Sequence, residues 1–328
     1  MRAAAILMVI GFHAFPSMIT GGYLGVDVFF VISGFLISRI TIREMQDGTF
    51  TFYGFYSRRI RRIFPALALV ISVTLLMGWR ILLPKEYLSL GRHGLAGTSL
   101  IPNFLLQKES GYFDITIAQK PLGHLWSIGV EEQFYVLWPF LLLLTRKLRI
   151  SALASVLVIT ALSLLQSLSV GREFSRAGYF LPQYRAWEIG IGCLLGIMNK
   201  EKLQKISDRQ SDILSIAGAA LVLTPLCTEK SLNVPSSIYS MGILSATFGT
   251  AALLISGEKK ATFVRLILSH PWIVALGKIS YSLYLWHWPL IVYAKYLNGL
   301  QPLGAWRWAI LALAVGLLAL SLRFVETP

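Results

Sequence analysis

A succession of long apolar runs constrains this chain more than any other feature. A helix that crosses a bilayer needs about 20 apolar residues, and runs of roughly this length recur along the whole sequence. The sequence therefore predicts an all-α, polytopic membrane protein with about ten transmembrane helices in a single transmembrane domain, residues 1–328. The predicted spans are residues 3–19, 23–42, 63–83, 126–145, 150–170, 178–198, 212–227, 238–256, 273–297 and 305–323.

The distribution of charge supports this assignment and indicates an orientation. Charged residues make up only 14% of the chain, against about 25% in an average soluble domain. The net charge of +14 does not predict a nucleic-acid partner, because Lys and Arg gather in short loops between apolar runs. These loops are residues 43–62, 146–149, 199–211 and 257–265, and cytoplasmic loops are typically enriched in positive charge. The pattern predicts that both chain ends are cytoplasmic.

One predicted loop is much longer than the others. Residues 84–125 fall on the extracytoplasmic side, and the apolar run 95–106 within them is too short to span and contains Pro102. We expect it to be a re-entrant or interfacial segment. The two cysteines, Cys193 and Cys227, lack the close spacing of a metal site, so no metal is expected.

The first predicted span carries two polar residues whose spacing suits a long phosphorylated donor. Arg2 and His13 are eleven residues apart, which on a helix places them on nearly the same face and about 16 Å apart along the axis. An arginine holds phosphate as a bidentate fork, and a deeper histidine can accept a hydroxyl proton. The alternative is a histidine at the membrane interface and an ordinary positive charge at the N-terminus.

A carboxylate follows closely in the second span. Asp27 stands among aromatic and aliphatic residues, where a carboxylate must be paired or protonated. It either orients His13 or stabilises the start of its own helix. Nearby glycines, Gly21, Gly22, Gly25 and Gly34, permit close approach of helix backbones.

A basic cluster precedes the third predicted span. Arg58, Arg59, Arg61 and Arg62 are candidates for binding the phosphates of a nucleotide-linked donor. The alternative is retention of positive charge at the cytoplasmic surface with lipid headgroup contacts, and charge alone favours this alternative.

The fourth span begins with a polar segment. His124 and Glu131 are seven residues apart and would share a helix face. Glu131 or Glu132 is a candidate for orienting a base or binding sugar hydroxyls, and Trp126 and Gln133 are candidates for acceptor binding. The alternative is a helix N-terminus stabilised by acidic side chains.

Two further polar features are predicted to be structural. Arg185 and Glu188 have the i, i+3 spacing of an ion pair on one helix face. His287 stands between Trp286 and Trp288, which is typical of an aromatic belt at the membrane interface.

Taken together, these segments resemble the membrane acyltransferase-3 family, of the type that O-acetylates O-antigen and other cell-surface polysaccharides. The resemblance covers most of the chain and follows one order. Its segments are the Arg-x10-His spacing from Arg2 to His13, GGYLGVDVFFVISGFLIS at 21–38, FYSRRIRRIFPAL at 55–67, SGYFD at 110–114, PLGHLWSIGVEEQFYVLWP at 121–139, RAWEIGIG at 185–192, ISYSLYLWHWPL at 279–290 and LRFVETP at 322–328.

The resemblance implies a function. Members use cytoplasmic acyl-CoA, usually acetyl-CoA, as a co-substrate rather than a bound cofactor, and they acylate hydroxyls of extracytoplasmic or lipid-linked glycans at the bacterial cytoplasmic membrane. It places His13 at the family's essential histidine, Arg2 at its paired arginine, and the family's Arg-x-x-Arg element on Arg58/Arg61 or Arg59/Arg62. It also strengthens the catalytic candidacy of His124, Glu131 and Glu132.

The sequence departs from the family pattern at both ends. The Ile-Asp-Gly-Leu run that often precedes the arginine is missing, and so is the SGNH-hydrolase domain that follows in many relatives. We expect either a stand-alone form or a shortened chain. The sequence contains no recognisable nucleophile motif around Ser or Cys, which favours direct transfer from the thioester. The rival hypothesis is a transporter or flippase of acyl or glycan intermediates, because intramembrane charges also mark substrate paths.

Overall fold

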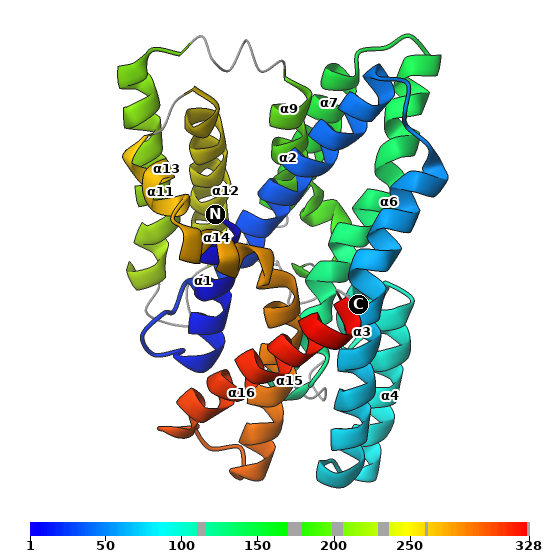
Figure 1. Cartoon of the computed structure of the whole chain (residues 1–328), viewed down its shortest axis with the longest axis vertical. Helices are drawn as coiled ribbons and strands as arrows, with labels where there is room; N and C mark the ends of the chain where they lie inside the picture. Colours follow the sequence, from blue (N-terminus) through cyan, green and yellow to red (C-terminus); the bar gives the residue numbers. More distant parts are fainter. Residues whose placement is uncertain (110–115, 170–178, 199–205, 229–235, 260–261, 327–328) are drawn as a thin grey trace. The chain divides into compact units, whose positions relative to one another are not determined.

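The computed structural model describes residues 1–109, 116–169, 179–198, 206–228, 236–259 and 262–326 (Figure 1). Within these ranges every regular element is a helix, as predicted. The SGYFD segment at 110–114 and the predicted cytoplasmic lysines Lys200, Lys202 and Lys205 lie outside the described residues.

The chain divides into two compact units. Unit 1 comprises Met1–Phe50, Phe134–Ser175 and Pro182–Lys278, and unit 2 comprises Thr51–Gln133, Arg176–Leu181 and Ile279–Pro328. Helix α6 (Trp126–Lys147) contributes its first eight residues to unit 2 and the rest to unit 1.

Unit 1 is built around α2 (Gly25–Gln46), which packs against α1 (Arg2–Ala14) and α9 (Ala186–Ile197). A second pair, α11 (Asp208–Thr228) with α12 (Ser236–Lys259), also packs closely. Apolar side chains from these helices form one core, including Ala5, Met8, Val28, Ile32, Trp187, Val222, Ile243 and Ala246. The remaining elements are η1 (Gly22–Leu24), α7 (Ala152–Ser169), η5 (Pro182–Tyr184), α13 (Phe263–Leu268) and α14 (Pro271–Lys278).

Small residues allow α2 and α9 to cross with their backbones in contact. A Cβ atom at Gly34 would overlap with the carbonyl oxygen of Ile189, and one at Gly192 would overlap with that of Val31. Close packing of this kind is typical of helices that associate in lipid. There, apolar side chains gain little free energy by exchanging contacts with lipid for contacts with another helix. The predicted close approach at Gly34 is confirmed.

Unit 2 is built around α3 (Phe52–Ile81), which packs against α4 (Pro84–Thr98) and α15 (Ser280–Leu297), and Figure 1 shows α3 and α4 side by side. Two tyrosines join α15 to α3: the Tyr293 hydroxyl donates to the Thr74 carbonyl oxygen at 2.6 Å, and the Tyr281 hydroxyl donates to that of Ile63 at 3.0 Å. The remaining elements are α5 (Pro102–Lys108), η2 (Ile117–Gln119), η3 (Gly123–Leu125), α16 (Trp306–Ser321) and η6 (Leu322–Glu326).

The long predicted loop, residues 84–125, is partly helical. The run predicted as a re-entrant or interfacial segment, 95–106, comprises the end of α4 and most of α5, with a break between them at Ser99–Ile101. Pro102 begins α5 in the first-turn position that proline tolerates, where its missing N–H would have no helical partner in any case.

Among the residues that the structure describes, six helices are long and apolar enough to cross a membrane. They are Gly22–Gln46, Phe52–Ile81, Gly123–Lys147, Ala152–Ser169, Met241–Glu258 and Trp306–Glu326. Helices α7 and α16 leave most of their apolar side chains exposed, with Leu162 58% and Leu320 55% accessible. Faces this apolar need lipid as their solvent, and the chain is a multi-pass, all-α membrane protein.

Three predicted spans differ from the structure within the described residues. The span at 178–198 consists of the short turn η5 followed by α9, which has only 12 residues and is too short to cross the hydrocarbon core. The span at 3–19 ends as a helix at Ala14, because Phe15 precedes Pro16 and leaves the helical region. At about 1.5 Å per residue, α1 is shorter than the hydrocarbon core. The span at 273–297 is two helices, α14 and α15, which meet at Ile279 between Gly277 and Ser280. Glycine and serine both weaken a continuous helix.

Candidate functional site

The predicted pair at the N-terminus shares one uninterrupted helix. Arg2 begins α1 and His13 lies in its last turn, so the two side chains project from nearly the same face about 16 Å apart along the axis. Both are half-buried. The Arg2 Cβ lies beside Gly277 at the end of α14, and the His13 ring lies 5.3 Å from that of Phe12. The predicted helical spacing is present, and the catalytic role of the pair stays a prediction.

Asp27 has a charged partner that neither of the two interpretations anticipated. It lies in the first turn of α2, and its Oδ1 accepts a hydrogen bond from Nη2 of Arg185 at 2.5 Å. Nη1 of Arg185 is 3.1 Å from the Glu188 carboxylate, which confirms the predicted i, i+3 ion pair. All three side chains are at most 1% exposed. Unit 1 thus contains a buried triad in which one guanidinium lies between two carboxyl groups.

The basic cluster lies close to acidic side chains within unit 2. Arg58, Arg61 and Arg62 are exposed on the first half of α3, and Arg59 is half-buried with its guanidinium 4.8 Å from the ring centre of Phe55. Arg59 and Arg62 both interact electrostatically with the buried carboxyl group of Glu132 on α6. The predicted donor-binding and catalytic groups of this unit are therefore neighbours.

Two residues of this acidic region were not anticipated by sequence reasoning. Tyr281 interacts electrostatically with Glu131, Glu132 and Arg62, and also with Glu326 near the C-terminus. The Glu326 carboxylate accepts hydrogen bonds from Ser282 at 2.5 Å and Ser321 at 2.7 Å. Both Tyr281 and Glu326 stand in segments that carry the family resemblance, ISYSLYLWHWPL and LRFVETP, which was the available signal.

His124 lies in a different setting from the predicted one. It belongs to the 3₁₀ turn η3, directly before α6, so it does not share a regular α-helical face with Glu131. Its ring centre is 5.9 Å from that of His287. The Tyr284 hydroxyl donates to the His124 carbonyl oxygen at 2.8 Å and lies 2.7 Å from the Ser127 hydroxyl. The turn places two imidazoles and two hydroxyl groups together in the interior of unit 2.

The predicted aromatic belt is wrong for this segment. Trp286, His287 and Trp288 are 3%, 0% and 5% exposed, so they are interior side chains of unit 2. The Nδ1 atom of His287 lies 2.7 Å from the Tyr284 carbonyl oxygen, one turn earlier on α15. Packing around α15 outweighs the preference of tryptophan for a lipid–water interface.

The predicted acceptor-binding residues make internal contacts. Trp126 is buried, with its ring 4.7 Å from that of Tyr179 and 5.5 Å from that of Phe180. The Gln133 amide donates to the Leu100 carbonyl oxygen at 2.6 Å and to Asn103 Oδ1 at 2.8 Å. Their acceptor-binding role stays a prediction, and the observed contacts join α6 to α5.

The predicted catalytic residues fall into both units. His13 and Asp27 belong to unit 1, whereas His124, Glu131 and Glu132 belong to unit 2. In unit 1 the arrangement provides Arg2 and His13 on one helix, and a buried ionic triad. In unit 2 it provides a basic surface beside two carboxyl groups, which suits an anionic group next to a proton-accepting site.

Comparison with known proteins shows which proteins this chain resembles over its whole length. The chain is 30% identical over 346 residues to YrhL of Bacillus subtilis, which is named provisionally as a peptidoglycan O-acetyltransferase. It is 31% identical over 344 residues to the O-acetyltransferase OatA of Staphylococcus aureus. The alignments cover all of this chain but only 54% and 56% of the two relatives, so the chain spans about half their length.

No solved structure matches the chain significantly. The family described as an acyltransferase domain matches residues 1–325. The chain therefore belongs to the acyltransferase-3 family.

Proposed function

We propose that this protein transfers an acetyl group from cytoplasmic acetyl-CoA to a hydroxyl of an extracytoplasmic cell-surface glycan. The observation that carries the proposal is the family match over residues 1–325, together with two relatives named as O-acetyltransferases. One relative's name includes peptidoglycan, so peptidoglycan joins O-antigen and lipid-linked glycans as a candidate acceptor. The proposed location is the bacterial cytoplasmic membrane, with both chain ends cytoplasmic.

The basic surface at the start of α3 supports the choice of donor. Coenzyme A carries phosphates at one end and the reactive thioester at the other, joined by a narrow flexible arm. Arg58, Arg59, Arg61 and Arg62 offer phosphate ligands within unit 2. In unit 1, Arg2 offers another phosphate ligand and His13 lies about 16 Å further along the same helix.

The reaction requires one base and no redox partner. In the proposed step, His13 accepts the proton of the acceptor hydroxyl while that oxygen attacks the thioester carbonyl carbon. The carbon–sulfur bond breaks, the CoA thiolate takes the proton from the imidazolium, and free CoA and the O-acetyl ester leave. Where an intermediate carrier relays the acetyl group across the bilayer, His13 activates the hydroxyl of that carrier by the same chemistry.

A substitution at His13 tests the proposal. His13→Ala should abolish O-acetylation of the surface glycan, measured by mass spectrometry of the isolated glycan as the loss of one acetyl increment. His270→Ala is the matched control, because His270 is an exposed histidine of the same unit outside the candidate site. Wild-type membranes should release CoA from acetyl-CoA only when acceptor is present. Persistent acetylation in His13→Ala at equal protein level contradicts the mechanism, and acceptor export without CoA release would indicate a transporter.

A further inference from the structure

The buried triad of unit 1 has more acidic groups than basic ones. The carboxyl groups of Asp27 and Glu188 face a single guanidinium, that of Arg185, and all three side chains are at most 1% exposed. If both carboxyl groups were ionised, one surplus negative charge would be buried away from water. Burying an uncompensated charge costs so much free energy that the group takes up a proton instead. The balance of charge therefore requires one proton in the triad.

The helices that pack against α9 supply no second cation to this place. Helix α7 has no charged side chain. Helix α12 carries Glu258 and Lys259 in its last turn, where Glu258 pairs with Arg39. Among the described residues, the charges that act on Glu188 come from Asp27 and Arg185. The surplus charge must be removed within the triad itself.

Hydrogen-bond geometry shows which carboxyl group is ionised. Asp27 Oδ1 accepts an aligned hydrogen bond from Arg185 Nη2 at 2.5 Å. Arg185 Nη1 lies 3.1 Å from Glu188 Oε1, but among the described residues neither carboxyl oxygen of Glu188 receives a hydrogen bond. A charge-assisted hydrogen bond stabilises the ionised form of its acceptor. Asp27 is therefore the carboxylate, and Glu188 is the group that holds the proton.

One proton on Glu188 also satisfies the remaining oxygen of Asp27. Asp27 Oδ2 is buried and receives no hydrogen bond from another described residue, yet the two carboxyl groups lie within hydrogen-bonding reach of each other. Carboxylates only accept hydrogen bonds, so a bond between two carboxyl groups requires a proton on one of them. Glu188 then donates to Asp27 Oδ2. Its contact with Arg185 becomes one between a cation and a neutral carboxyl group.

The position of the triad explains why a proton is the ligand that fits. Asp27 lies in the first turn of α2 and Glu188 in the first turn of α9, the two helices whose backbones touch at Gly34 and Gly192. Such close packing leaves no room for a molecule, whereas a proton needs none. The described residues contain no group of three or more acidic, histidine or cysteine side chains that could hold a metal ion.

We propose that Glu188 binds a proton at neutral pH and donates it to Asp27 Oδ2, which makes the triad a neutral proton-binding site inside unit 1. The bound proton allows α2 and α9 to pack in lipid without burying a net charge. Glu188 is thus a structural group that keeps its proton, not a carboxylate that accepts one during acyl transfer. The proposal rests on the geometry of the triad and is independent of the proposed function.

Infrared difference spectroscopy tests the protonation of Glu188 directly. The C=O stretch of a protonated carboxyl group is separate from the bands of carboxylates and amides, provided that the detergent contains no ester groups. Glu188→Gln keeps the shape of the side chain and an N–H donor for Asp27 Oδ2. At neutral pH, the spectrum of the wild-type chain minus that of Glu188→Gln should show one protonated-carboxyl band and no loss of a carboxylate band. Glu258→Gln is the matched control, because Glu258 pairs with Arg39, and it should lose a carboxylate band only.

A second variant and isotope labelling assign the proton to one residue. In Asp27→Asn, Glu188 becomes the remaining carboxyl group beside Arg185 and should ionise, so this variant should also lose the protonated-carboxyl band. In the wild-type chain, carbon-13 labelling of glutamate side chains should shift the band, and labelling of aspartate should leave it in place. Loss of a carboxylate band in Glu188→Gln, persistence of the protonated-carboxyl band in Asp27→Asn, or a shift with labelled aspartate would each overturn the proposal.

Discussion

Asp27 and Arg185 form an ion pair in which both side chains are only 1% exposed, although 158 residues separate them in the chain. The pair joins the first turn of α2 to the residue that precedes α9. Glu188 shares the same guanidinium. Removing one partner of a buried ion pair leaves an uncompensated charge, which is a much larger penalty than the pair itself is worth in stability.

Arg185→Ala should therefore destabilise the protein by about 3–5 kcal/mol, because two buried carboxyl groups lose their common partner. Arg185→Lys keeps the charge but cannot contact both carboxyl groups as the planar guanidinium does. Its stability should therefore lie between that of wild type and that of Arg185→Ala. Thermal unfolding in detergent, followed by tryptophan fluorescence, measures the effect. Arg43→Ala is the control: Arg43 pairs with Asp47 at 3.7 Å on the surface, and its loss should cost less than about 1 kcal/mol. Equal effects of the two alanine variants would contradict the importance of the triad.

The crossing of α2 and α9 should be intolerant of a single methyl group. Gly34→Ala places a Cβ against the backbone carbonyl of Ile189, which cannot move as a flexible side chain would. The expected loss of stability is about 1–3 kcal/mol. Gly316→Ala on α16 is the matched control, because a Cβ there has open space and alanine favours the helix by up to about 1 kcal/mol. Unfolding temperatures of the two variants should move in opposite directions.

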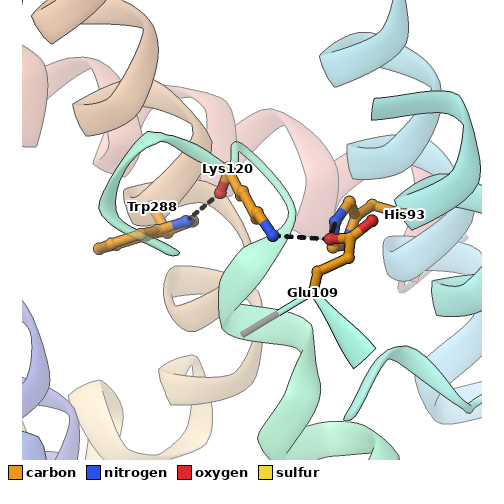
Figure 2. Close-up of polar contacts among 4 residues, drawn as sticks. All are labelled: His93, Glu109, Lys120 and Trp288. Atoms are coloured by element: carbon orange, nitrogen blue, oxygen red, sulfur yellow. Dashed lines mark hydrogen bonds and ion pairs between the residues drawn. The ribbon is translucent and has the colours of Figure 1, made fainter. Parts of the chain in front are cut away.

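Glu109 accepts hydrogen bonds from His93 and Lys120 (Figure 2). These contacts predict that the folded protein loses stability in acid, when Glu109 becomes protonated. The folded-state pKa of about 2 lies below the ordinary value of 4.5, so the unfolded chain binds this proton more readily. Stability from Glu109 is fully present above about 4.5 and is lost as the pH falls from there through about 2. Glu109→Gln should be less stable than wild type at neutral pH and should lack this acid-dependent component. Asp47→Asn, at an exposed position, should retain it. The test compares unfolding midpoints of the three proteins across this range, and an unchanged acid profile in Glu109→Gln would contradict the assignment.

The basic surface on α3 should determine the apparent affinity for the donor. Replacement of Arg59 or Arg62 by alanine removes a charged hydrogen bond worth about 1.5–3 kcal/mol, which corresponds to a tenfold or larger rise in KM for acetyl-CoA. Arg80→Ala is the control, since Arg80 lies in the last turn of the same helix beside Trp79. Initial rates of CoA release measure KM. If KM rises as much for Arg80→Ala as for Arg62→Ala, the effect comes from general loss of positive charge, and the specific donor-binding role is contradicted.

Local periodicity explains which parts of the site could be predicted. The alignment of Arg2 with His13 and the pairing of Arg185 with Glu188 both follow from the repeat of one helix, and both are present. His124 was misplaced on α6 because sequence does not mark where a 3₁₀ turn gives way to an α-helix. Trp286 and Trp288 were placed at an interface because their type fits a lipid boundary, whereas neighbouring helices bury them.

The sequence by itself determined that this is a helical membrane protein, because the length and apolarity of its runs leave lipid as the only suitable solvent. It also determined which side chains share a helix face, since that depends only on the helical repeat. Only the tertiary structure decided that Arg185 pairs with Asp27, and that Glu109 bridges His93 and Lys120. Such contacts arise from how distant segments pack and how buried charges find partners, and no spacing along the chain encodes them.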